Sequence, residues 1–259
     1  MTEVVAVDWS GRAKGAGEAI WLARVARGRL EELENGLDRH AVVQRLIELA
    51  REEPRLAVGL DFAFSFPAWY AADRGWTSCR EIWRAMLHDA EPLLEACEPP
   101  LWGRAGKTKP PGQTAFRETD AAVHAHPKSV FQIGGAGAVG TGSLRGMKHL
   151  ATLEASGFSI WPFNEPGWPR VVEIYPRLFT PGVVKSRHRA RRSHLEARFP
   201  EQDPVLRERA AGSEDAFDAA VSALVMAEHM TAIENLSAAE PGSLASIEGA
   251  IWAPVPESA

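Results

Sequence analysis

The clearest pattern along the chain is an apolar run that stops at an aspartate. Residues 4–7 (VVAV) end at Asp8, and residues 56–60 (LAVGL) end at Asp61. Continuous apolar runs of this length are typical of strands that are buried on both faces of a parallel sheet. Ligands gather beyond the carboxyl ends of such strands, so we expect both aspartates at one edge of the sheet.

The remaining periodicity predicts further strands and helices. Residues 18–25 and 29–34 flank a turn at Arg27 and Gly28 and predict an antiparallel hairpin. Strands are also predicted at 129–133, 158–163, 170–177 and 250–253, and helices at 38–52, 79–97, 146–157 and 213–230. We therefore expect an α/β fold with a single domain over residues 1–259. The region 62–145 is interpreted as an insertion, because it has no obvious sheet of its own.

The most unusual predicted helix is 213–230. Residues 216–227 are apolar except for Asp218 and Ser222, which is the pattern of a helix inside a core. Asp215 fits the first turn after a serine N-cap, where the helix dipole stabilises negative charge. Asp218 lies one turn further in, and burial of an unpaired carboxylate is unfavourable. This indicates a metal-binding or catalytic role for Asp218, with a structural hydrogen bond as the alternative.

Composition narrows the class of protein. The 259 residues are 45% hydrophobic and 24% charged, which is ordinary for a globular protein with a sizeable core. No stretch approaches 18 apolar residues and the first residues lack a signal-peptide pattern, so we expect a soluble, cytoplasmic protein without membrane association. Cys79 and Cys97 have no metal-ligand spacing and are interpreted as core residues. A net charge of -5 argues against broad, non-specific binding of nucleic acid.

One segment is nevertheless strongly basic, residues 185–198 (KSRHRARRSHLEAR), and it directly precedes the helix with the two aspartates. A charge run is often only a solvated helix face. Its single sign in an acidic protein makes contact with nucleic-acid phosphates the alternative. The residues predicted to make that contact are Lys185, Arg187, Arg189, Arg191 and Arg192.

The acidic residues have one chemical interpretation in common. Like charges at close range push one another toward protonation, and a hard cation resolves this conflict. Carboxylates, water and phosphate oxygens are ligands of Mg²⁺ or Mn²⁺, and two such ions about 3.5 to 4 Å apart can hold the attacking water and the leaving oxygen of a phosphodiester. A lysine or arginine at their meeting point would argue against this. The predicted metal ligands are Asp8, Asp61, Asp215 and Asp218, and Asp215 or Glu173 would orient the water.

Four motifs carry a resemblance to a known family. They are VDWSG at 7–11, GLDFAFSFP at 59–67, EIYPR at 173–177 and DAFDAAVSAL at 215–224. These segments resemble the family called domain of unknown function 429, predicted nucleases with a ribonuclease H-like fold. The order of the motifs is also similar to the Holliday-junction resolvase branch of that superfamily. The resemblance implies a mixed sheet, with an antiparallel hairpin and parallel strands flanked by helices, and a metal-dependent nuclease. The acidic positions that it matches are Asp8, Asp61, Glu173, Asp215 and Asp218.

Two weaker signals point to other functions. The glycine loop 134–142 formally matches the dinucleotide fingerprint at Gly135, Gly137 and Gly140, although no acidic residue follows at the expected distance. It supports the alternatives of a nucleotide-using phosphotransferase of the actin-like branch or a non-catalytic nucleotide- or nucleic-acid-binding protein. His124 and His126 would suit one face of a strand, but no cysteine or third histidine lies nearby to complete a zinc site.

Overall fold

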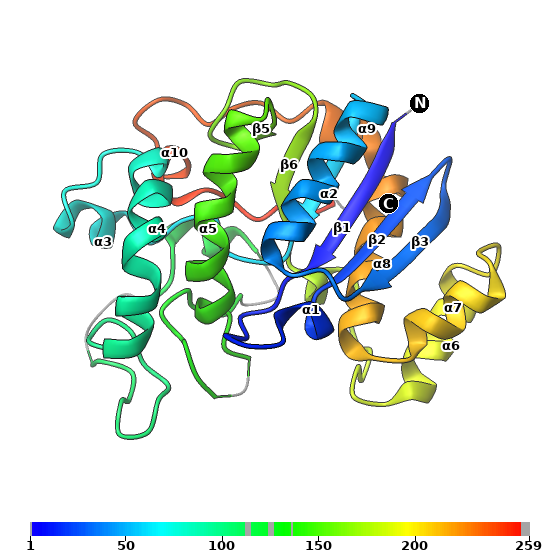
Figure 1. Ribbon diagram of the computed structural model, residues 1–259, viewed down its shortest axis with the longest axis horizontal. Helices are drawn as coiled ribbons and strands as arrows, with labels where there is room; N and C mark the ends of the chain where they lie inside the picture. Colours follow the sequence, from blue (N-terminus) through cyan, green and yellow to red (C-terminus); the bar gives the residue numbers. More distant parts are fainter. Residues whose placement is uncertain (1, 112–114, 124–126, 136, 255–259) are drawn as a thin grey trace.

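The structure is a computed structural model that describes residues 2–111, 115–123, 127–135 and 137–254 (Figure 1). Within these residues, six strands form one mixed sheet in the order β3-β2-β1-β4-β6-β5. The hairpin strands β2 and β3 are antiparallel to their neighbours, whereas β4, β6 and β5 run parallel to β1. The predicted α/β class and mixed sheet are confirmed. The strands are β1 (Glu3–Asp8), β2 (Trp21–Ala26), β3 (Arg29–Asn35), β4 (Leu56–Leu60), β5 (Ser159–Ile160) and β6 (Arg170–Glu173).

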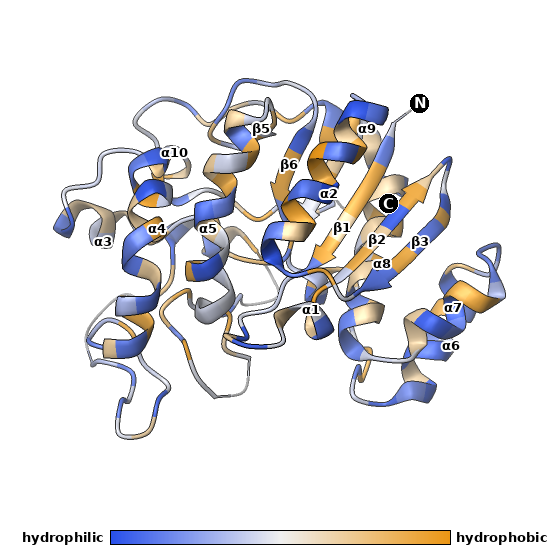
Figure 2. Cartoon of the chain, viewed as in Figure 1, coloured by the Kyte–Doolittle hydropathy of each residue, from blue (hydrophilic) through white to orange (hydrophobic). Residues whose placement is uncertain are grey.

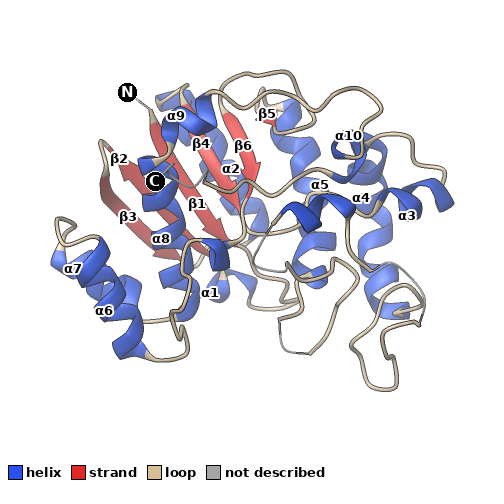
Figure 3. Ribbon diagram, turned by 180° about the vertical axis from the view of Figure 1, so that it is seen from behind, coloured by secondary structure: helices blue, strands red, loops and turns tan. Residues whose placement is uncertain are grey.

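Helices cover both faces of the sheet (Figures 1 and 3). One face is covered by α2 (Arg39–Glu52) and α5 (Gly140–Ala155), and α4 (Cys79–Ala96) packs on α5. The other face is covered by α8 (Glu214–Glu228), which contacts β1 and β2. No helix among the described residues is both long and apolar enough to cross a membrane. The shorter helices are α1 (Ala16–Ala19), α3 (Ala68–Asp73), α6 (His188–Arg198), α7 (Pro204–Ala211), α9 (Met230–Glu234) and α10 (Ala245–Glu248), with 3-10 turns η1 (Glu118–Ala122) and η2 (Pro176–Leu178).

The central strand β1 is apolar on both sides because each side faces a different core. Val5 and Val7 belong to the cluster on the α2 and α5 side, and Val4 and Ala6 belong to the cluster on the α8 side. Alternate side chains of a strand point to opposite faces, so two covered faces require a continuous apolar run. Figure 2 shows the hydrophobic central strands between helices that are hydrophilic on their outer sides.

Several predicted boundaries differ from the structure. Residues 18–20, predicted to begin the hairpin, lie in or directly after α1. Residues 129–133 form a loop rather than a strand of the sheet. Phe131 packs with Phe66 and Tyr70 in an aromatic cluster formed by residues between β4 and α5. The predicted strand at 158–163 is reduced to the two residues of β5, and 250–253 contributes only an isolated bridge.

The helix predicted at 146–157 begins six residues earlier, at Gly140. A Cβ at Gly146 would lie 2.8 Å from the ring of Phe62, so the absent side chain lets α5 approach the segment that follows β4. This tertiary contact outweighs the low helix propensity of glycine. Between β4 and α5, the described residues form α3, α4, η1 and loops and contribute no strand to the sheet.

Candidate active site

Asp8 and Asp61 lie side by side at one edge of the sheet. Parallel pairing sets Val7 opposite Leu60, so the next residue of each strand is an aspartate at the same level. The Asp61 backbone N–H donates to the Val7 carbonyl at 3.1 Å, which continues the ladder to this point. The two carboxyl groups are close enough for each to affect the pKa of the other. The predicted meeting of these two aspartates at a common edge is therefore observed.

The surroundings disfavour negative charge on both groups. Burial raises the pKa of Asp8 well above its usual value, and the charges of Asp61 and Asp218 raise it further. Burial also raises the pKa of Asp61 to about 8, with Asp218 as the next cause and Lys185 opposing the shift. Without an added positive charge, the pair holds a proton near neutral pH.

The two aspartates of α8 have different environments. Ser213 caps the helix through the Ala216 N–H at 3.0 Å, as predicted, and this sets the register of the first turns. Asp215 is half-buried, and burial raises its pKa. Asp218 Oδ2 accepts a hydrogen bond from Lys185 Nζ at 2.6 Å, whereas its buried Oδ1 has no hydrogen-bond partner among the described residues. Burial raises the pKa of Asp218, and Lys185 opposes that shift.

Glu173 lies at the end of β6 but is turned to another partner. It is 2% exposed and Arg117 is 3% exposed, and Arg117 Nη1 donates to Glu173 Oε2 at 2.8 Å while Nη2 bonds Oε1. The Phe64 backbone N–H donates to the same Oε2 at 2.9 Å. Arg117 is shared with Asp120, at 2.7 Å. Both oxygens of Glu173 are thus bonded inside the protein, and its contacts are those of a structural ion pair.

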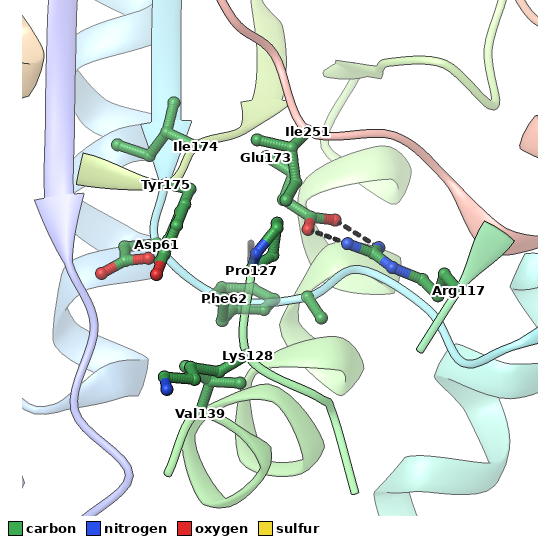
Figure 4. Close-up of a pocket in the computed structure, with 11 residues that line it drawn as sticks. Asp61, Phe62, Arg117, Pro127, Lys128, Val139, Glu173, Ile174, Tyr175 and Ile251 are labelled. Carbon is green, nitrogen blue, oxygen red and sulfur yellow. Dashed lines mark hydrogen bonds and ion pairs between the residues drawn. The ribbon is translucent and has the colours of Figure 1, made fainter. Parts of the chain in front are cut away.

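Figure 4 shows how Asp61 and Glu173 are separated. A cavity of about 20 Å³ lies between them, enough for about one water molecule. Asp61 and Tyr175 point toward one another at one end of the cavity, and the Glu173 carboxylate meets Arg117 at the other. Burial raises the pKa of the Tyr175 hydroxyl, and the nearby charge of Asp61 adds to the shift.

The basic segment is only partly free. Lys185 is held by Asp218. Arg191 is buried and donates to the Ala211 carbonyl at 2.8 Å, which fixes α6 against the segment before α8. Arg192 pairs with Glu196 at 2.9 Å. The residues that stay exposed at the start of α6, without an ion pair to any described residue, are Arg187 and Arg189.

Comparisons of the chain with protein-family models, with characterised proteins and with solved structures found no match. The resemblance of its motifs to the family of predicted nucleases therefore stays a prediction.

The side chains of the acidic site are of the type that binds a hard cation, but their arrangement in this structure fits one less well. Its donors are carboxylates, one buried oxygen of Asp218 has no hydrogen-bond partner among the described residues, and burial together with neighbouring carboxylates raises the pKa values of Asp8 and Asp61. However, no three acidic, histidine or cysteine side chains among the described residues are gathered closely enough to hold a metal ion. Lys185 forms an ion pair with Asp218 of the cluster, and the charge of Arg12 acts on Asp215.

The glycine loop is explained by packing. A Cβ at Gly134 would collide with the Gly103 carbonyl, and one at Gly140 would collide with the Val130 carbonyl. The segment before the loop is not a strand of the sheet, so the strand, loop and helix context of a dinucleotide site is missing. His124 and His126, the residues of the suggested zinc pair, lie outside the described residues.

Sequence reasoning missed Arg117 and Tyr175, and it predicted a phosphate contact for Lys185 rather than the ion pair with Asp218. Arg117 and Lys185 neutralise predicted catalytic carboxylates across 56 and 33 residues of chain, respectively, and no local pattern reports such contacts. Tyr175 is different, because it lies two residues after Glu173 at the end of a predicted strand. This position at the end of a predicted strand could have identified Tyr175 as a residue near the site.

Proposed function

We propose that the chain is a divalent-metal-dependent nuclease that hydrolyses phosphodiester bonds of DNA or RNA. The observation that carries the proposal is the placement of Asp8 and Asp61 side by side at the carboxyl ends of the adjacent parallel strands β1 and β4. The unpaired Oδ1 of Asp218 lies in the same electrostatic cluster. Open α/β sheets bind their ligands at this kind of edge. The ribonuclease H-like plan suggested by the motifs has acids at the same places.

The proposed roles follow from position. Asp8 and Asp61 would hold Mg²⁺ or Mn²⁺ together with Asp218, and Asp215, on the first turn of α8, would orient the attacking water. The bound cation would stabilise the developing charge on the attacking and leaving oxygens. Glu173 is assigned to positioning, because Arg117 occupies its carboxylate. Arg187 and Arg189 would contact the phosphate backbone.

Lys185 sets a condition on this proposal. Its ammonium occupies one oxygen of Asp218, so it competes with a cation for that carboxylate. A cation that bound Oδ2 of Asp218 would displace Lys185, and the charge of Lys185 would then be available to a substrate phosphate. Replacement of Lys185 by Met should therefore increase the thermal stabilisation that Mn²⁺ gives to the protein.

The test uses cleavage and binding together. Single- and double-stranded DNA and RNA are incubated with the protein and Mg²⁺, Mn²⁺ or a chelator, and thermal unfolding is measured with and without Mn²⁺. Asp8→Asn and Asp218→Asn should remove both cation-dependent cleavage and most of the Mn²⁺ stabilisation. Glu214→Gln is the matched control, because Glu214 is an exposed acid on the first turn of α8. Cleavage that survives in Asp8→Asn, or a wild-type protein with neither cleavage nor Mn²⁺ stabilisation, would refute the proposal.

A further inference from the structure

A second concave region lies on the α2 and α5 side of the loop that follows Asp8. It is a pocket of about 350 Å³, within the range of about 300 to 1,000 Å³ that is typical of small-molecule sites. It is lined by the start of α2, by the middle of α5 and by Glu91 of α4. Its basic side chains are Arg39, His40, Arg145, Lys148 and His149.

The two carboxylates of the pocket do not neutralise this charge. Glu91 is engaged by Arg145, with two hydrogen bonds of 2.7 Å to its two oxygens. Asp38 caps α2 by accepting a hydrogen bond from the Ala41 N–H at 2.9 Å. Both acids therefore have hydrogen-bond partners, and the pocket is lined by more basic side chains than acidic ones.

Arg39 and Lys148 provide the uncompensated charge. Among the described residues, Arg39 donates hydrogen bonds to backbone carbonyls, those of Ser10 at 2.8 and 3.0 Å and of Arg12, and it forms no ion pair. The charges of Glu91 and Asp38 act on its guanidinium without contacting it. Lys148 is half-buried and forms no ion pair with any described residue. Burial of a charge without a counter-ion has a free-energy cost, and a bound anion would reduce that cost.

The ionisation of neighbouring groups agrees with this geometry. Burial lowers the pKa of His149, and the charges of Lys148 and Arg39 add to this shift. Together they bring the pKa to about 4. Burial also lowers the pKa of Arg39, with Arg145 as the next cause. Both shifts are in the direction that a positive potential produces, and an anion in the pocket would reverse that potential.

We infer that this pocket binds a phosphate group. The ammonium of Lys148 can recognise phosphate oxygens as a point charge. The Nη1 of Arg39 makes no hydrogen bond to a described residue, so it can donate a charge-assisted hydrogen bond to the same phosphate. The phosphate belongs to a nucleotide, to the end of a nucleic-acid strand or to free phosphate. The site is separate from the acidic cluster, and the inference does not require the acids to cleave a bond.

The loop after β1 joins the two regions. Arg39 holds the carbonyls of Ser10 and Arg12, and Arg145 holds that of Gly11. These three residues begin two positions after Asp8. A phosphate bound in the pocket is therefore anchored close in the chain to the proposed catalytic acid.

The inference is tested by calorimetry on the full chain with a chelator present, which separates it from metal binding. The probes are inorganic phosphate, a 5′-phosphorylated dinucleotide and the same dinucleotide with a 5′-hydroxyl. Binding of the phosphorylated dinucleotide but not of its hydroxyl form supports a strand end or nucleotide, and equal binding of inorganic phosphate supports free phosphate. Lys148→Ala should weaken binding about 10-fold or more, because it removes a charge-assisted hydrogen bond.

Lys14→Ala is the control, because Lys14 is an exposed lysine in the same loop region but does not line the pocket. It should leave the dissociation constant unchanged. Lack of binding by all three probes would overturn the inference. Equal weakening by Lys14→Ala and Lys148→Ala would also overturn it, since it would show a general effect of charge.

Discussion

The buried Arg117 network makes a quantitative prediction about Glu173. Replacement of Arg117 by Met removes the cation that pairs with Glu173 and Asp120, which are 2% and 7% exposed, respectively. Breaking a buried ion pair by removing one partner costs about 3 to 5 kcal/mol. In a domain of this size, that corresponds to a fall of about 10 °C in Tm.

Glu173→Gln is the milder change. The amide oxygen can still accept the hydrogen bond from the Phe64 N–H, and Arg117 keeps Asp120 as a partner. We therefore expect a cost of about 1 to 3 kcal/mol. Combination with Arg117→Met should cost less than the sum of the single changes, by about 0.5 to 3 kcal/mol, because the two residues are coupled.

Urea unfolding of the four proteins in this cycle provides the measurement, with an unchanged m value as the check that the folded and unfolded states are comparable. Arg198→Met is the matched control, because the Arg198–Glu228 pair is 52% and 36% exposed and should contribute less than about 1 kcal/mol. An Arg117→Met protein as stable as Arg198→Met would refute the structural role. Glu173→Gln that unfolds normally but has lost cation-dependent cleavage would instead assign Glu173 to catalysis.

Two further predictions concern packing and pH. Gly59→Ala should lower the free energy of unfolding by about 1 to 3 kcal/mol, because the new Cβ would lie 2.5 Å from Met226 Sδ and 2.9 Å from Ile174 Cγ2; an unchanged urea midpoint would contradict this packing. The pKa of His149 is lowered to about 4 in the folded protein, so its contribution to stability is complete above pH 6.5 and is lost as the pH falls toward 4. The stability of the wild type relative to His149→Asn should therefore decrease over this interval, and a difference that does not change with pH would show that His149 is not held neutral.

The parts of the fold that were predicted correctly depend on local signals. β1 and β4 follow from apolar runs that end at Asp8 and Asp61, α2 follows from helical periodicity, and α8 follows from its apolar residues and the N-cap at Ser213. Because parallel neighbours end at the same edge, these local signals were also enough to bring the first two aspartates together.

The parts that were missed depend on contacts between distant segments. The sequence around Phe131 has the pattern of a strand, but the side chain of Phe131 packs in the aromatic cluster between β4 and α5. Glu173 was interpreted as a possible catalytic acid because no residue near it in sequence indicates that it pairs with Arg117, 56 residues earlier. Likewise, the half-buried contact of Lys185 with Asp218 arises only after α6 and α8 have packed.

The order of the strands leaves β3 and β5 at the two outer edges of the sheet. An open edge is a template for association with another chain, and both edges here are poor templates. β5 has only two residues, and β3 contains three glutamates, with its Leu30 N–H occupied by the side chain of Gln202 at 2.8 Å. The strand order that sets Asp8 at the end of a central strand therefore also protects the protein from edge-to-edge aggregation.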